Sequence, residues 1–200
     1  MKSRITGTCR QNFRGTNSVT NAKPILRGLV LMTGLLLAAA CGRNDRFETP
    51  ASLGQLDPAR MSFAISEVIS LQANGQRVWC VPFARNASGI QIRGDAHTWW
   101  AAAEGEYRRG TKPSVGAVMV FSKSSSLTRG HVAVVSRVVS KREVLIDHAN
   151  WSRNQISRSM SVIDVSKRGD WSAVRVESIP GAYGSTYPVS GFIYPNAYDT

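Results

Sequence analysis

The sequence predicts an α+β domain in which N-terminal helices pack on an antiparallel β-sheet. Apolar residues recur at helical spacing through residues 57–107. From Val115 onward, short segments rich in Val and Ile are separated by Ser, Gly, Lys and Arg, which is typical of strands joined by turns. Helices followed by strands, without β-α-β alternation, favour an α+β fold. A chain of 200 residues with 42% hydrophobic content is long enough for one domain with short extensions.

Three helices are expected before the strands. Asp57 and Pro58 form an N-cap and first-turn pair. The apolar residues that follow at helical spacing are Met61, Ile65, Val68 and Ile69. A second helix is predicted over residues 80–87, ended by Gly89, and a third over residues 95–107.

The strand region comprises five predicted strands and a C-terminal segment. The strands are residues 115–121, 131–139, 143–149, 161–166 and 172–179. The segment that follows, residues 181–195, is rich in Gly, Tyr and Pro, so we expect irregular or edge structure there.

The N-terminus has the pattern of an export signal. Residues 28–40 are apolar and uncharged, follow six basic residues, and are too few to span a bilayer. The stretch "LAAACG" resembles a bacterial lipoprotein signal, with Cys41 as the lipidated residue. The prediction is an export signal over residues 1–41, a tether over 42–57 and a domain over 58–200, anchored in a membrane on the periplasmic side. Cleavage after Ala40 with simple secretion is the alternative.

The part of the chain after Cys41 carries a moderate positive charge. Cys41 is followed by 19 of the 25 basic residues and by all 13 acidic residues, a net charge of +6. This balance suits an anionic polymer but lacks the clustered charge of a nucleic-acid binder, so no nucleic-acid partner is expected.

Cys80 is the cysteine with a candidate chemical role. Signal removal would take Cys9 away and lipidation would occupy Cys41, which leaves Cys80 as a lone thiol in an oxidising compartment. Three other interpretations stay open: a buried inert cysteine, a disulfide with an unlipidated Cys41, and a metal site with His131 and His148. No closely spaced ligand pair supports a metal, and none is expected.

Cys80 stands where a helix N-terminus could activate it. A thiol attacks as thiolate, and its ordinary pKa of about 8.5 must be lowered by a helix N-terminus or a nearby imidazole. Cys80 precedes Pro82, a residue favoured in first helical turns, and the amides there could also stabilise an oxyanion. His131 is the candidate base, and Gly130 before it would let a substrate approach the backbone closely.

Strand pairing provides a third member of the site. A turn at residues 140–141 places His131 opposite Asn150. Side-chain alternation then puts His131, His148 and Asn150 on one face and Asp147 on the other. Asn150 would orient the imidazole, as in the Cys-His-Asn arrangement of papain-like proteases. A one-residue shift of the turn would bring Asp147 to this face instead.

Tryptophans provide the candidate substrate contacts. Trp79 is next to the proposed nucleophile and is expected to form a wall of the cleft. Trp99 and Trp100 could stack on sugar rings, although their helical spacing predicts that at least one of them is in the core. Trp100 is retained as a substrate-binding candidate.

Five motifs together resemble the CHAP family, the cysteine, histidine-dependent amidohydrolases and peptidases. They are "CVPFAR", "DAHTWW", "PSVGAVMVF", "GHVAVV" and "DHANW", within residues 61–165. The resemblance implies a papain-like domain with Cys80 as nucleophile, His131 as general base and Asn150 completing the site. The family often has a glutamate where this chain has His148, so the orienting residue is either His148 or Asn150.

The resemblance also implies a function. The expected reaction is hydrolysis of a peptidoglycan amide, either between muramic acid and L-alanine or within the stem peptide, by an enzyme that needs no cofactor. Peptidoglycan is then the partner, and the need for an activator protein stays open. The alternative is a lipoprotein that binds or regulates the cell wall and has lost turnover.

Overall fold

The computed structural model describes residues 56–197. The predicted export signal, Cys41 and most of the tether lie outside the described residues. Two main helices precede the strands, α1 (Pro58–Ala73) and α2 (Cys80–Ser88), followed by the 3-10 helix η1 (Ala96–Thr98) and α3 (Trp99–Ala102). Within residues 56–197, no helix is both long and apolar enough to cross a membrane.

The ends of α1 and α2 confirm the helix signals in the sequence. The Asp57 carboxylate accepts hydrogen bonds from the first-turn amides of Ala59 and Arg60, as an N-cap does. The helix α2 begins at Cys80 and ends where Gly89 adopts a left-handed φ of 82°.

The predicted third helix is wrong in its length. The chain leaves α3 after Ala102, turns at Gly105 with a φ of 77°, and enters strand β1 (Tyr107–Gly110). The left-handed turn ends the helix early, so only residues 96–102 of the predicted 95–107 are helical.

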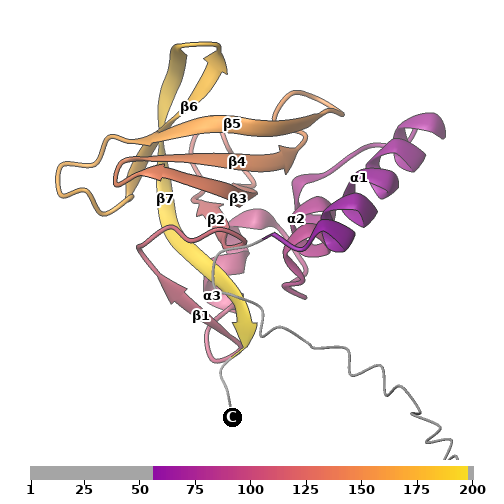
Figure 1. Ribbon diagram of the computed structural model, residues 1–200, viewed down its shortest axis with the longest axis horizontal. Helices are drawn as coiled ribbons and strands as arrows, with labels where there is room; N and C mark the ends of the chain where they lie inside the picture. Colours follow the sequence, from indigo (N-terminus) through magenta and orange to yellow (C-terminus); the bar gives the residue numbers. More distant parts are fainter. Residues whose placement is uncertain (1–55, 198–200) are drawn as a thin grey trace, which may run out of the picture. The chain divides into compact units, whose positions relative to one another are not determined.

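The remaining strands close into a barrel. They are β2 (Val118–Phe121), β3 (His131–Ser140), β4 (Glu143–Ala149), β5 (Ile156–Asp164), β6 (Ala173–Ile179) and β7 (Ala182–Ala197). Neighbours are antiparallel in the order β1-β7-β2-β3-β4-β5-β6, and β7 also pairs with β6. Figure 1 shows α1 and α2 on one side of the strands. The α+β class is confirmed, and the predicted antiparallel sheet is closed into a barrel.

Strand β7 corrects the expectation for the C-terminal segment. Instead of irregular structure, residues 182–197 form one long strand that pairs with β6, β2 and β1 in turn (Figure 1). Its register shifts between the pairs Val120↔Gly191 and Phe121↔Val189, a bulge that bends the strand. The ring of Trp100 occupies the space that a side chain at Gly191 would need. Glycine therefore marks a bend in this strand, not its end.

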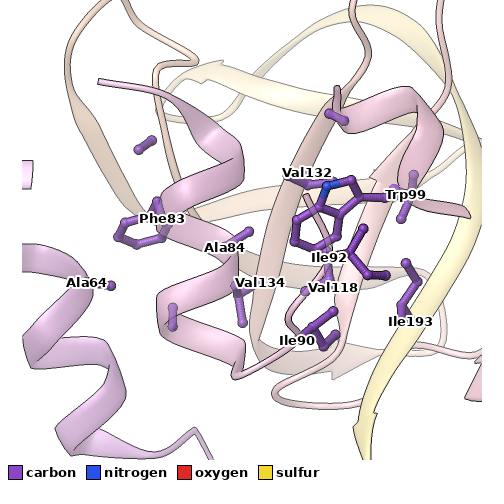
Figure 2. Packing of buried hydrophobic residues seen from close by; sticks show 14 of the residues in the cluster. Ala64, Phe83, Ala84, Ile90, Ile92, Trp99, Val118, Val132, Val134 and Ile193 are labelled. Atoms are coloured by element: carbon purple, nitrogen blue, oxygen red, sulfur yellow. The ribbon is translucent and has the colours of Figure 1, made fainter. Parts of the chain in front are cut away.

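The two faces of β3 pack into two different cores. Val132 and Val134 point toward the helices, and Figure 2 shows them beside Ala84 of α2 and the Trp99 ring. The core inside the barrel includes Ala133 and Val135 of this strand. Because side chains alternate, His131 belongs to the inner face while the backbone of β3 lies against α2.

The β3–β4 register agrees with the prediction near the site but not at the turn. Val134 pairs with Asp147, which follows from placing His131 opposite Asn150. At the other end, Ser140 pairs with Glu143, so the predicted turn at residues 140–141 is wrong. Two register irregularities between these ends compensate for the difference.

Candidate active site

Cys80 opens into a cavity of about 680 Å³ between the start of α2 and the start of β3. The residues lining it include Trp79, Cys80, Arg129, Gly130, His131 and Asn150. Residues 50 to 70 positions apart in the chain meet here because α2 packs against both β3 and β4. Of the residues predicted for the site within the domain, His148 and Trp100 do not line the cavity.

Cys80 is a free, partly buried cysteine. Burial raises the pKa of its thiol, and this effect exceeds the lowering by backbone groups of Val132, Cys80 and Val81 and by the charge of Arg129. The helix N-terminus therefore acts in the predicted direction, but the net shift is opposite to the prediction. At neutral pH Cys80 rests as a thiol.

His131 and His148 form a buried pair. Nε2 of His131 lies 2.8 Å from Nδ1 of His148. The side chains are 4% and 0% exposed, so the hydrogen bond is shielded from solvent. Trp151 packs edge-on against His131 with a centroid distance of 5.0 Å, and Phe121 does so at 5.8 Å. These aromatic rings hold the imidazole of His131 in one orientation.

Both imidazoles rest in the neutral form. Burial, followed by the charge of His148, holds the pKa of His131 well below its ordinary value of 6.5. Burial lowers the pKa of His148 to about 3. A neutral His131 can accept a proton, as a general base must. In the described part of the chain, no hydrogen bond joins Cys80 to His131, although both line the same cavity.

Asn150 and Asp147 have other partners. Asn150 leaves the strand direction with a φ of 62°, and its Oδ1 accepts a hydrogen bond of 2.9 Å from the amide of Asn154. Asn150 lines the cavity, but the partner of His131 is His148. The Asp147 carboxylate is turned to the other face, as the alternation predicts, where it accepts a 2.7 Å hydrogen bond from the amide of Ser159.

Comparison of the sequence with known protein families identifies one match. Residues 72–150 match the family model described as the CHAP domain. Over these residues the chain is similar to the CHAP family. The matched segment includes Cys80, His131 and His148, and the family comprises cysteine- and histidine-dependent amidohydrolases and peptidases. Comparison with curated proteins gives no match.

The tryptophans that the sequence suggested as substrate contacts lie in different environments. Trp79 lines the cavity and is 37% exposed, so its ring is available to a ligand. Trp100 is not among the residues lining the cavity; its ring packs against Gly191 and Arg109. Trp99 is fully buried, which agrees with the prediction that one of the pair is in the core.

Gly130 lines the cavity, but glycine is required there by the neighbouring backbone and not, as the sequence predicts, by an approaching substrate. Its φ is 66°, and a Cβ would lie 2.8 Å from both the amide nitrogen of His97 and the carbonyl oxygen of Phe121. The close approach is therefore to the chain's own backbone. This packing fixes the start of β3 and so the position of His131.

Two arginines of the cavity were missed by the sequence reasoning. The guanidinium of Arg77 lies 4.0 Å from the ring centroid of Trp79, and that of Arg129 lies 5.4 Å from it. Arg129 is also ion-paired with Asp95 on the same cavity. The alternation of Arg77 and Trp79 in "RVW" was the available signal, because such residues share one face of an extended segment.

Within residues 56–197, no group of three or more His, Cys, Asp or Glu side chains is arranged to hold a metal ion.

Proposed function

We propose that this chain is a cysteine-dependent peptidoglycan hydrolase that cleaves an amide bond through an acyl-enzyme. The observation that carries the proposal is that Cys80, at the N-terminus of α2, and His131 line the same cavity. His148 contacts the ring nitrogen Nε2 of His131. A nucleophile, a base and a group that orients the base are the three parts that such chemistry requires.

The proposed reaction begins with attack of the Cys80 sulfur on the amide carbonyl carbon. The thiol proton passes to Nδ1 of His131, and the carbonyl oxygen gains negative charge beside the amides at the start of α2. The C–N bond then breaks, and His131 gives the proton to the leaving amine. Water, deprotonated by His131, attacks the thioester and releases the acid product and the free thiol.

The entrance of the cavity supports an anionic, sugar-containing substrate. The guanidinium groups of Arg77 and Arg129 lie 4.0 Å and 5.4 Å from the ring centroid of Trp79. Asp95 is the acidic residue among the side chains lining the cavity. Since Asp95 is paired with Arg129, Arg77 is available for a substrate carboxylate. The Trp79 ring can pack on an apolar sugar face. Both bonds under consideration, muramoyl–L-alanine and a stem-peptide amide, lie near such groups.

The test is hydrolysis of purified peptidoglycan by the full-length chain and by its Cys80→Ala variant. We expect soluble fragments from the wild type alone, and mass spectrometry of the new termini identifies the amide that is cut. Equal release by the two proteins would rule out a thiol nucleophile.

A second candidate is a wall-binding or regulatory protein without turnover. The raised pKa of Cys80 and its lack of a hydrogen bond to His131 within the described residues favour it. In that case, the folded wild type and the Cys80→Ala variant would co-sediment equally with peptidoglycan, and neither would release fragments. Activity that depends on an added protein fraction would instead indicate an activator partner.

We also propose that the chain is exported and anchored to a membrane on the periplasmic side through a lipid on Cys41. The support is the sequence pattern of residues 28–41, which lies outside the described residues. The Cys41→Ala variant should leave the membrane fraction. Unchanged fractionation of this variant argues against the lipid anchor.

A further inference from the structure

We propose that Met160 is a positioning residue that sets the proton positions of the two buried histidines, so that His131 presents an unprotonated Nδ1 to Cys80. The inference rests on the proposed hydrolytic function, because it concerns the base of that reaction. Its evidence is a second contact of His148, on the ring atom opposite to His131.

The contact joins Nε2 of His148 to the sulfur of Met160 over 3.3 Å. A thioether sulfur has lone pairs and no proton, so it can only accept a hydrogen bond. Because His148 is 0% exposed, water does not compete for this nitrogen. The contact is favourable only when Nε2 of His148 carries the proton.

One proton position then determines the next. A neutral imidazole has a single N–H, so a proton on Nε2 of His148 leaves Nδ1 as an acceptor. The 2.8 Å contact at Nδ1 must therefore be donated by Nε2–H of His131. His131 is in turn left with an unprotonated Nδ1, the nitrogen that a general base needs.

The opposite arrangement is unfavourable at both ends. If Nδ1 of His148 donated to His131, the lone pair on Nε2 of His148 would face the lone pairs of Met160. His131 would then carry its proton on Nδ1 and could not accept one from the Cys80 thiol. A histidine base in the wrong tautomer is a recognised cause of lost turnover.

A bulge in β5 fixes the chain immediately before Met160. Ile146 pairs with Met160 and His148 with Ser157, so two residues of β5 stand opposite Asp147. One of them, Ser159, has a φ of 52° and donates its amide to Oδ1 of Asp147 over 2.7 Å. The buried carboxylate of Asp147, which the proposed reaction does not use, thus holds the bend that carries Met160 toward His148.

The test compares wild type, Met160→Leu and Met160→Gln as full-length chains. Leucine has a similar volume but accepts no hydrogen bond, whereas the glutamine side-chain oxygen does accept one. Nitrogen-15 NMR of labelled histidines at neutral pH distinguishes protonated from unprotonated ring nitrogens. We expect the Nε2–H form for His131 and His148 in the wild type and in Met160→Gln, and a gain of the Nδ1–H form in Met160→Leu.

Activity provides the second readout. Met160→Leu should lower kcat roughly tenfold with little change in KM, because the base and not substrate binding is affected, and Met160→Gln should restore most of it. Nδ1–H tautomers in the wild type, or unchanged tautomers in Met160→Leu, would overturn the proposal. The wild-type spectrum alone can overturn the proposal, even if both variants fail to fold. Expected tautomers in a protein without hydrolytic activity would support the proton arrangement and contradict the proposed function.

Discussion

Acidification should destabilise the fold through the two buried histidines. In the unfolded chain, each binds a proton with the ordinary pKa of 6.5, whereas burial lowers the pKa of His148 to about 3 and that of His131 well below 6.5. Between the folded and unfolded values, the unfolded state binds more protons than the folded state does. The free energy of unfolding therefore rises with pH. The contribution of His148 to it is fully present above pH 6.5 and is lost as the pH falls toward 3.

The size of the loss follows from the linkage relation. Between about pH 7.5 and about pH 5, protonation of one unfolded histidine lowers the free energy of unfolding by about 2 kcal/mol. This loss applies to His148, whose folded pKa of about 3 lies below the range, and the lowered pKa of His131 adds a loss of the same sign. A change of this size is a substantial part of the typical stability of a domain. Carboxylates contribute little in this range because they titrate at lower pH.

Urea unfolding at several pH values in this range measures the effect. The variants His131→Gln and His148→Gln should each remove part of the pH dependence, because glutamine does not titrate. His97→Gln is the matched control, since His97 is only half-buried on η1 and lies outside the pair. If the pH dependence is the same in all four proteins, the neutral, buried state of the pair is refuted.

Two further predictions concern turnover. The acid limb of the kcat/KM profile should lie below pH 6.5, because the lowered pKa of His131 keeps this side chain unprotonated down to lower pH. A limb centred above pH 6.5 would show that His131 rests in the protonated form. His148→Ala should reduce kcat at least tenfold more than Asn150→Ala, since His148 contacts His131 while Asn150 contacts Asn154. Pre-steady-state acylation rates measure the effect, and the reverse order would indicate that Asn150 is the orienting residue.

The helices α1 and α2 could be predicted because their end signals are local. Asp57 caps α1 with its own side chain, and Gly89 ends α2 with its own backbone conformation. Strand β7 could not, because its residues read as turn formers and its pairing partners are distant in sequence. The bend at Gly191 lets β7 pair with three neighbouring strands, and in a sequence a glycine is more often the sign that a strand ends.

The members of the site were predictable, but their contacts were not. A helix start selected Cys80, a strand start selected His131, and strand alternation brought His148 and Asn150 to the same region. Which of these two meets His131 depends on how the chain leaves β4. Asn150 turns to a φ of 62° and caps the following loop, so the last strand residue on the inner face, His148, takes the position.

The state of Cys80 depends on a competition that spacing does not reveal. A helix N-terminus and burial act on the pKa of a thiol in opposite directions, and the second prevails here. A neutral thiol beside a neutral imidazole is less reactive toward oxidants than a thiolate is. In the oxidising compartment to which we propose that the chain is exported, this resting state would protect the Cys80 thiol. In the proposed reaction, the Cys80 proton moves to His131 only when a bound carbonyl can accept the sulfur. That transfer requires an unprotonated Nδ1 on His131, which the proposed tautomers of the two histidines provide.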